Sequence, residues 1–433
     1  MTAKTLTATA LSLLDMRILK EILLVSGGQY LGAGMSLLAT IWAAHVLTVR
    51  DFGLLSIFVA TMTLTTEITG KSLDWGIVRF SSFYLDQAPM TAHALIKRVF
   101  VLRFLISFFV CAAGFLSAAL LARRLFQNPD YSTPIALGFV GSVGMSMWGY
   151  GQAILQAYQR FGLHGFISFA NGFAKLAGMF VLVYLGLCHS QSVEATYVII
   201  AFATLVLAVR LMPKDFLRTT GIEAGLMRKF VHFTKWPFVA NVFVILYTHL
   251  SFFLLLYFSG PAEVAVYSSA WRLVFALDLL AYSLVVVFLP KASRITNTSD
   301  FVAYAVQTLK ISLPMCVLLV PLVFHSRTIM TVLYPDQYVS GTRMLQVLLA
   351  GTLVSLPAHP ISLVMFAANR PRVFAFAALA TLVFSLIGGL LVIPTYAGLG
   401  AALVAASTKA LYGVLLLIFS YLSMRKTATA IAL

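Results

Sequence analysis

Ionisable side chains inside long apolar stretches are the residues of this sequence that could do chemistry. A charge at the centre of a bilayer costs at least about 2.5–3.5 kcal/mol, so it usually faces a cavity or a partner of opposite charge. Glu67, Lys71 and Asp74 are spaced four and three residues apart, which places all three on one helix face. The carboxylates Glu67 and Asp74, together with Asp278 in a later apolar stretch, are candidates for binding a proton or a sodium ion.

Basic residues outnumber acidic ones at this depth. The five deep basic residues are Lys71, Lys175, Arg272, Lys310 and Lys409. Three of them, Lys175, Lys310 and Lys409, have no acidic residue nearby in their own stretch, which favours a water-filled central cavity over local ion pairs. A basic cavity suits an anionic ligand such as a phosphate or pyrophosphate group, because Lys supplies a point charge and Arg a fork of donors.

Structural ion pairs that hold helices together are the alternative interpretation of these charges. This alternative fits Glu67, Lys71 and Asp74 as well as the cavity does, because the three charges nearly compensate one another. We expect Arg103 and Arg343, near the ends of their stretches, to extend to the membrane interface.

The composition requires a membrane around these stretches. Of the 433 residues, 61% are apolar and only 10% are charged, whereas soluble domains carry about 25% charged residues. The net charge of +16 does not indicate nucleic-acid binding, because the basic residues lie in short loops between apolar stretches. Cys111, Cys188 and Cys316 are far apart and form no metal or disulfide motif.

The apolar stretches predict an all-α, polytopic membrane protein with twelve transmembrane helices, since a span needs about 20 mostly apolar residues. The predicted spans are 22–46, 52–78, 99–122, 134–157, 165–187, 193–211, 237–258, 264–290, 302–325, 342–367, 372–393 and 398–422. With both termini in the cytoplasm, the inside segments hold 19 basic residues. The outside loops hold four, which are Arg50, Arg123, Arg124 and Arg327. This asymmetry is what the positive-inside rule predicts.

The chain is expected to form two six-helix lobes related by a pseudo-two-fold repeat. The expected parts are a cytoplasmic or interfacial arm (1–21), an N-terminal lobe (22–211), a cytoplasmic linker (212–236), a C-terminal lobe (237–424) and a cytoplasmic tail (425–433). RDFGLLS (50–56) and AEVAVYS (262–268) begin equivalent spans, and QAYQR (156–160) and FAANR (366–370) end equivalent spans. In transporters, repeats of this kind place the substrate site between the halves.

The sequence contains no catalytic motif. It has no HExxH, no GxxxxGK[ST] and no GxSxG, and its loops are too short for a nucleotide-binding domain. We therefore predict that the protein is not an enzyme and uses no cofactor or metal.

Several segments resemble the polysaccharide biosynthesis proteins, the oligosaccharide-lipid flippase branch of the multidrug/oligosaccharidyl-lipid/polysaccharide exporter superfamily. The segments are LTVRDFGLLSIF (47–58), LQAYQRFG (155–162), YSSAWRLVFAL with FLPKAS (267–293), LYPDQYVSGTRMLQVLLAG (333–351), AANRPR (367–372) and GLGAALVA (398–405). They occur in the family's order over nearly the whole chain.

The resemblance implies two lobes around a V-shaped cavity and alternating access. It implies a substrate too, an undecaprenyl-pyrophosphate-linked oligosaccharide that moves across the bacterial inner membrane for O-antigen (lipopolysaccharide), capsule or exopolysaccharide synthesis. The expected partners are this lipid-linked oligosaccharide, membrane lipid, a polymerase and other glycan-assembly proteins. The basic residues would bind the pyrophosphate, and Glu67, Asp74 or Asp278 would couple transport to protons or sodium ions.

Two other functions remain open at this point. A drug/cation antiporter of the same fold usually needs a carboxylate in its first helix, and 22–46 has none. A membrane-embedded glycosyltransferase or ligase normally carries a large outside loop, whereas the longest one here, about 326–341, has Asp336 as its single acidic residue.

Overall fold

The computed structural model describes residues 27–219, 224–292, 298–363 and 372–431 of the chain. Almost all of these residues are helical, and no strand occurs among them. The predicted arm, 1–21, and the start of the first predicted span lie outside the described residues. The prediction of an all-α protein is therefore confirmed for the part of the chain that the structure describes.

Six helices follow one another in the described residues of the first half. They are a helix over 27–46, α2 (Val49–Gln87), α3 (Pro89–Leu120), α4 (Ser132–Ala157), α5 (Phe161–Tyr184) and α6 (Ser190–Leu211). A π-helical turn, η1 (Leu121–Leu125), extends α3, and a 3-10 turn, η2 (Pro129–Tyr131), precedes α4. Thr48 is the N-cap of α2, and its hydroxyl oxygen accepts a hydrogen bond from the N–H of Asp51 at 3.1 Å.

The second half contains longer and shorter helices. They are α7 (Ala224–Ala292), α8 (Thr298–Phe324), α9 (Ser326–Leu333), α10 (Thr342–Ser355), α11 (Ala358–Ser362) and α13 (Arg372–Ile431), with a 3-10 turn, η4 (Asp336–Gly341), before α10. The 3-10 turn η3 (Asp215–Arg218) and the first residues of α7 occupy much of the predicted linker, 212–236.

Breaks divide the two longest helices. Gly260 has φ 81° and ψ −178°, a conformation that residues with a Cβ rarely adopt, and Pro261 then starts the second part of α7 with a fixed helical φ. In α13 the break lies at Ala397, with φ 47° and ψ −126°. Pro357 lies directly between α10 and α11, where a proline cannot continue the hydrogen bonding of the helix.

Eight of the described helices are long and apolar enough to cross a membrane. Two of them, in α7 and α13, are 54 and 51 residues long, which is enough for two spans each, and both contain a break. The helix over 27–46 and α4 occupy the positions of the first and fourth predicted spans. Twelve helical segments of the described chain thus correspond, in order, to the twelve predicted spans.

Helix starts reveal the repeat. Val49 starts α2, and Pro261, 212 residues later, starts the second part of α7. Ser132 starts α4 and Thr342, 210 residues later, starts α10, each after a 3-10 turn. Phe161 and Arg372, the first residues of α5 and α13, are 211 residues apart. The predicted pseudo-two-fold repeat is confirmed by these nearly constant separations.

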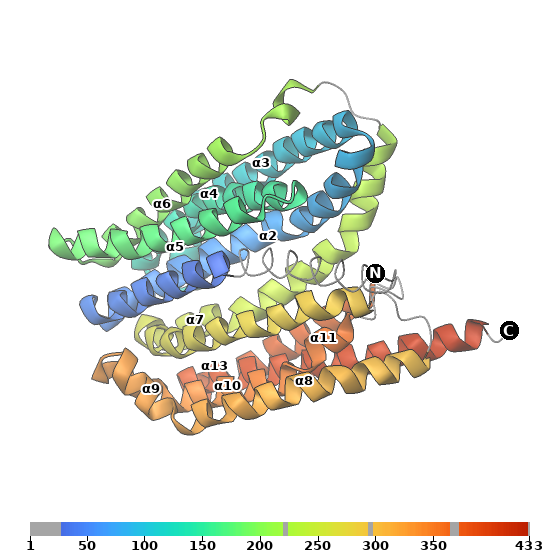
Figure 1. Cartoon of the computed structure of the whole chain (residues 1–433). Helices are drawn as coiled ribbons and strands as arrows, with labels where there is room; N and C mark the ends of the chain where they lie inside the picture. The colour runs from blue at the N-terminus through green and yellow to red at the C-terminus, as the bar shows by residue number, and fades with distance from the viewer. Residues whose placement is uncertain (1–26, 220–223, 293–297, 364–371, 432–433) are drawn as a thin grey trace, which may run out of the picture.

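The two halves contact each other where α2 packs against α7. Figure 1 shows the blue-to-green helices on one side of the molecule and the yellow-to-red helices on the other, with α7 passing between them. Gly53 is required at this crossing, because a Cβ there would overlap the carbonyl oxygen of Pro261. Ser56 and Ser268, equivalent residues of the repeat, share a hydrogen bond of 2.7 Å. The pseudo-two-fold axis therefore passes close to these two hydroxyl groups.

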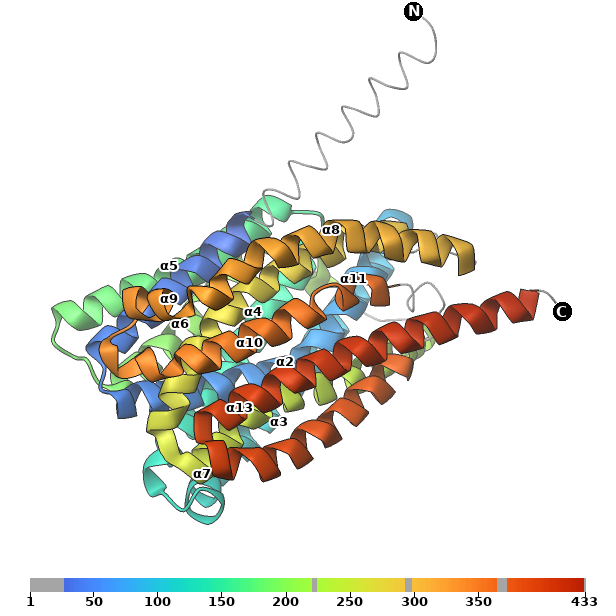
Figure 2. The same ribbon diagram turned by 90° about the horizontal axis from the view of Figure 1, so that it is seen from below.

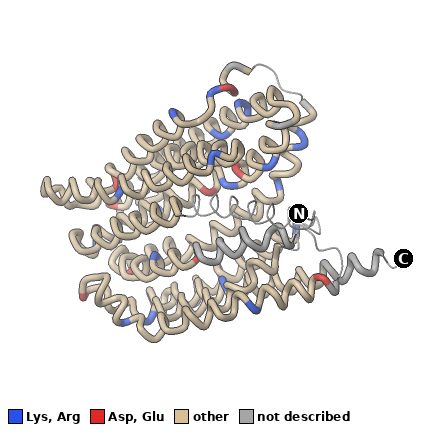
Figure 3. The backbone as a smooth tube through the Cα atoms, viewed as in Figure 1, with Lys and Arg blue, Asp and Glu red and all other residues tan. Residues whose placement is uncertain are grey.

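The outer surface is apolar, as a lipid-facing surface must be. On α3, large side chains such as Phe109 and Leu116 are exposed by 64% and 80%. Figure 2 shows α10 beside α8 and α13, and α10 contacts both of them. Charged residues are sparse along the helices in Figure 3. The few charges inside the helical body therefore stand out as candidates for a function.

Candidate functional site

Two adjacent cavities, of about 520 and 260 Å³, lie along α2. They share several lining residues, and we call them together the α2 cavity. The shared residues are Met62, Lys71, Met145, Trp148 and Gln152. The larger cavity is lined by the helix over 27–46, by α2, α4, α5 and α6, and by α7 from the second half of the chain. The α2 cavity thus lies mainly within the first half, and α7 contributes Arg272, Phe275 and Ala276 to its larger part.

Lys175 on α5 and Arg272 on α7 line the larger cavity from opposite halves of the chain. The Lys175 Nζ lies 5.6 Å from the centre of the Tyr197 ring. The Arg272 guanidinium lies 6.0 Å from the centre of the Phe52 ring, and its Nη1 donates a weak hydrogen bond of 3.4 Å to the Thr40 hydroxyl. Both contacts leave the positive charges uncompensated.

The charges of Lys175 and Arg272 repel each other across the cavity, because the two groups are close enough to interact. No carboxylate of the described residues forms an ion pair with either group. The Arg272 Nε is buried without a hydrogen-bond partner among those residues. A pair of this kind can bind an anion between its two members.

Lys71 lines both parts of the α2 cavity and forms an ion pair with Glu67 at 3.3 Å, one helical turn earlier. The side chains of Lys71 and Glu67 are 46% and 25% exposed, so both are accessible from the cavity. Asp74, the third member of the predicted group, forms an ion pair with Arg103 on α3 instead. The structure therefore separates this group into a pair beside the cavity and a carboxylate bound elsewhere.

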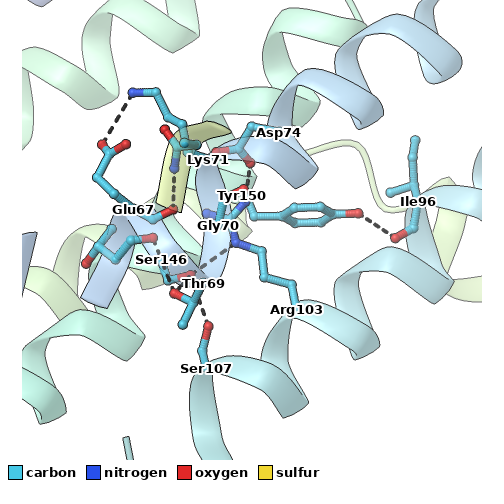
Figure 4. Close-up of polar contacts among 12 residues, drawn as sticks. Glu67, Thr69, Gly70, Lys71, Asp74, Ile96, Arg103, Ser107, Ser146 and Tyr150 are labelled. Carbon is cyan, nitrogen blue, oxygen red and sulfur yellow. Dashed lines mark hydrogen bonds and ion pairs between the residues drawn. The ribbon is translucent and has the colours of Figure 1, made fainter. Parts of the chain in front are cut away.

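Arg103, the partner of Asp74, has a side chain that is only 1% exposed. Figure 4 shows its contacts. Arg103 forms an ion pair with Asp74, and its Nε and Nη1 donate to the Ser146 hydroxyl at 3.1 Å and the Gly70 carbonyl at 3.3 Å. The guanidinium lies 5.6 Å from the centre of the Tyr150 ring. A Cβ on Gly70 would overlap the guanidinium, so glycine provides the space.

The prediction that Arg103 extends to the membrane interface is therefore wrong. The polar residues Lys97 and Arg98 suggested a span that begins at residue 99, whereas α3 already begins at Pro89. Lys97 instead donates hydrogen bonds of 3.0 Å to the carbonyls of Leu217 and Thr219, which lie beyond α6. The depth of Arg103 was predicted wrongly because Lys97 and Arg98 were taken to mark the end of the helix.

Lys409 on α13 forms an ion pair with Asp278 on α7, with Nζ 2.7 Å from each carboxylate oxygen. We did not predict this pairing, because the two residues are 131 positions apart and belong to different helices. The pair does not line the α2 cavity. The roles of Lys409 in substrate binding and of Asp278 in ion coupling stay predictions.

Lys310 does not join the other basic residues. It lies on the exposed face of α8, together with Val306, Leu313 and Val317, and does not line the α2 cavity. Its role in substrate binding likewise stays a prediction.

Glu194 on α6 is a buried carboxyl group that sequence reasoning missed. Its side chain is fully buried, and neither oxygen has a hydrogen-bond partner in the described residues. Asp51 on α2 is close enough to interact with it unfavourably. Glu194 is the second residue of the predicted span 193–211, whereas α6 begins at Ser190 and packs against α2 and α4.

The arrangement of helices is similar to that of solved membrane transporters. A structure described as the lipid II flippase MurJ, in an inward closed conformation, matches with a TM-score of 0.71 and 14% identity, over 95% of this chain and 90% of that one. An inward-facing multidrug resistance MATE transporter of the MOP superfamily matches with a TM-score of 0.71 and 11% identity, over 91% of this chain and 95% of that one.

A MOP superfamily transporter from Pyrococcus furiosus, described as having a binding pocket of reverse polarity, matches with a TM-score of 0.65 and 12% identity, over 94% of this chain and 96% of that one. These TM-scores show that the fold is shared, and the proteins described are a flippase and transporters rather than enzymes. No curated protein sequence matches the chain.

A sequence model of the family described as polysaccharide biosynthesis protein matches residues 18–296, which is more than half of the chain. The fold of the MOP superfamily and the motifs found along the sequence agree with this match. The chain therefore belongs to the polysaccharide biosynthesis protein family, as the resemblance of its sequence predicted.

Proposed function

We propose that this protein is a flippase that moves an undecaprenyl-pyrophosphate-linked oligosaccharide across the bacterial inner membrane, for O-antigen, capsule or exopolysaccharide synthesis. The observation that carries the proposal is the placement of Lys175 and Arg272, one from each half of the chain, in one cavity. Family membership supports the class of substrate.

A pyrophosphate group would compensate the charges that Lys175 and Arg272 bring into the cavity. Two uncompensated cations in a membrane protein are costly, and their mutual repulsion adds to the cost. An anion between them replaces repulsion with two attractive contacts, with the guanidinium as a fork and the ammonium as a point charge. Lys71 would add a third cation at the boundary between the two parts of the cavity.

One ligand bound by both halves would also favour movement of the halves relative to each other. α2 contacts the second half near its start, at Gly53 and Ser56, and again at Glu67, whose carbonyl accepts from the Asn241 amide of α7 at 3.1 Å. The cavity lies along α2 from Val59 to Val78. In the predicted topology the contact at Gly53 and Ser56 faces outside, so we infer that the cavity receives its substrate from the cytoplasmic side. Release outside would require this contact to open, as alternating access demands.

The walls of the α2 cavity suit the remaining parts of such a substrate. Trp148, Gln152 and Asn171 offer an aromatic face and amide groups, which can pack against and hydrogen-bond to sugars. The lipid tail would stay in the bilayer beside the apolar helices. Glu67, Asp74 or Asp278 would bind the coupling ion, and a polymerase and other glycan-assembly proteins would be partners.

Export of cationic drugs is the function we consider second, since multidrug transporters share this fold. The positive charges of Lys175 and Arg272 would repel a cationic drug from the larger cavity. A glycosyltransferase or ligase is less favoured still, because the family and the structural relatives give it no support.

The proposal is tested by measuring the binding of undecaprenyl pyrophosphate to the purified protein. We expect Lys175→Ala and Arg272→Ala each to raise Kd about 10- to 100-fold, because a charge-assisted hydrogen bond contributes about 1.5–3 kcal/mol. Lys229→Ala removes the same charge from an exposed position of α7 that does not line the α2 cavity, and it should leave Kd unchanged. The neutral lipid undecaprenol should bind all of these proteins alike.

Surface glycan provides the second measurement. The wild type and variants are expressed in a bacterium that lacks its own flippase, with membrane insertion verified for each. Rescue by the wild type that is lost with Lys175→Ala supports the proposal. Equal binding of pyrophosphate and neutral lipid by the wild type, together with drug resistance in cells, would overturn it in favour of the antiporter.

A further inference from the structure

A polar cluster outside the α2 cavity joins three helices of the second half. Asp278 lies on α7, Thr352 on α10 and Lys409 on α13. The Lys409 Nζ lies 2.7 Å from Oδ1 and 2.7 Å from Oδ2 of Asp278, and 2.9 Å from Oγ1 of Thr352. One positively charged nitrogen is thus surrounded by three oxygen atoms.

The hydrogen-bond donors and acceptors of this cluster match completely. A lysine ammonium has three N–H donors and no acceptor, and three oxygens accept from it here. The Thr352 hydroxyl donates its own hydrogen to the Leu348 carbonyl at 3.2 Å, so its lone pairs are available to Lys409. A carboxylate and a hydroxyl oriented in this way are ligands for a hard cation as well as for an ammonium group.

The other half of the chain shows that the fold does not need an ion pair at this place. By the separations of the helix starts, Asp278 corresponds to Thr66 on α2 and Thr352 corresponds to Ser142 on α4. These two residues are joined by a neutral contact, in which the Thr66 hydroxyl donates to the Ser142 carbonyl at 3.4 Å. The charges of the second half are therefore an addition to a contact that is neutral in the first.

The surrounding helices cover the cluster only in part, since the side chains of Asp278 and Lys409 are 33% and 31% exposed. Its other titratable neighbours are His359 on α11, whose charge interacts with both, and Tyr247 on α7, which interacts with Asp278. His359 is held by its own contact of 3.0 Å between Nδ1 and the Ser355 carbonyl. Asp278 is therefore the carboxylate that balances Lys409.

We propose that Asp278 and Thr352 form a monovalent-cation site whose occupant in this conformation is the ammonium group of Lys409. The tethered ammonium keeps the site filled without a cation from solution. Truncation of Lys409 at Cβ then opens the site to Na⁺ or to a small alkylammonium ion. The inference concerns the second half of the chain alone and does not depend on the identity of the transported lipid.

The test is thermal unfolding of purified Lys409→Ala in detergent, at equal concentrations of choline, sodium and n-propylammonium chloride. The removed atoms, three methylene groups and the ammonium, correspond to n-propylammonium. We expect the midpoint of Lys409→Ala to lie below that of the wild type in choline chloride. It should rise by at least about 2 °C, saturably, with n-propylammonium or Na⁺. The wild type should show no difference among the three salts.

Two control variants give the result its meaning. Asp278→Asn combined with Lys409→Ala removes the carboxylate as well, so its midpoint should be equal in all three salts. Lys229→Ala removes an exposed lysine of α7 that forms no hydrogen bond with Asp278 or Thr352, and it should behave as the wild type.

The proposal is overturned if Lys409→Ala responds to the three salts equally, or if the double variant keeps the response. Should Lys409→Ala fail to accumulate, its yield in membranes is measured in cells grown with n-propylammonium or with choline. Recovery with n-propylammonium alone supports the proposal, and equal yields with both ions contradict it.

Discussion

Arg103 illustrates how a single buried cation is kept inside the helical body. Its guanidinium has a carboxylate, a hydroxyl and a carbonyl around it, and the face of Tyr150 beside it. Ser146 ties this arrangement to α2, because its hydroxyl also accepts from Thr69 at 3.1 Å. The cluster joins α2, α3 and α4 and forms part of the wall of the α2 cavity.

We predict that Asp74→Asn lowers the free energy of unfolding by about 3–5 kcal/mol, because it leaves the buried charge of Arg103 without its counter-ion. Denaturant unfolding in detergent measures the change. Adding Arg103→Met to this variant should recover part of the loss. Glu67→Gln breaks the exposed pair with Lys71 and should cost only about 0–1 kcal/mol. Equal effects of Asp74→Asn and Glu67→Gln would contradict the assigned burial.

The sequence could predict how deep the charged residues lie in the membrane, but not which residues they pair with. The cavity was predicted from Lys175, Lys310 and Lys409, because depth follows from local apolar length and none of the three has an acidic neighbour in its own span. Of these three, Lys175 lines the α2 cavity, and Lys310 and Lys409 do not. The partners of Asp74 and Lys409 lie 29 and 131 residues away on other helices. Such pairs are a property of tertiary packing, which local spacing along one helix does not contain.

At the level of helices, the crossing of α2 and α7 depends on one missing side chain. Gly53 allows the backbone of α2 to approach the Pro261 carbonyl, and backbone atoms cannot move aside as the end of a flexible side chain can. Phe52 beside it packs on Tyr338 of η4, with ring centres 5.5 Å apart. The crossing therefore holds the two halves together by close contact of backbones.

We predict that Gly53→Ala weakens the contact between the halves and destabilises the protein by about 1–3 kcal/mol through overpacking. Gly34→Ala is the matched control, because a Cβ at Gly34 meets nothing within 4 Å. That change should leave stability the same or raise it, since alanine favours helix more than glycine does. The test compares the thermal unfolding midpoints of the two variants. Similar midpoints would argue against the close approach of the Gly53 backbone to the Pro261 carbonyl.

Helix positions were predictable because length and apolar composition are local properties. The breaks of α7 and α13 fell between predicted spans, at 259–263 and 394–397. The Gly260–Pro261 pair is a recognisable signal of a helix end followed by a helix start. Ala397 carries no such signal, because alanine favours helix and its positive φ is imposed by the surrounding structure.

At the level of the whole molecule, the contact of the two halves can be used to test alternating access. The Ser56 and Ser268 hydroxyls are 2.7 Å apart, so cysteines at both positions are placed for a disulfide. In a background without Cys111, Cys188 and Cys316, we predict that oxidation of Ser56→Cys/Ser268→Cys stops lipid transport in vesicles and that reduction restores it. Each single variant should be insensitive to oxidation. Transport by the fully cross-linked protein would show that this contact does not open.

The overall fold was largely predictable, because the family resemblance and the repeat both implied two six-helix lobes. The lengths between equivalent helix starts confirm this architecture. The shape and lining of the α2 cavity were not predictable, because they depend on how far the halves are rotated apart.

The hydrogen bond between Ser56 and Ser268 joins two equivalent residues of the repeat, as in a symmetric dimer. A residue that meets its own copy is the hallmark of a symmetric dimer, in which the two-fold axis brings identical groups together. Fusion of two half-length chains would preserve this meeting point while freeing each half to change. Asp278, which corresponds to Thr66, and Arg272, which corresponds to Ala60, are positions at which the two halves differ in charge.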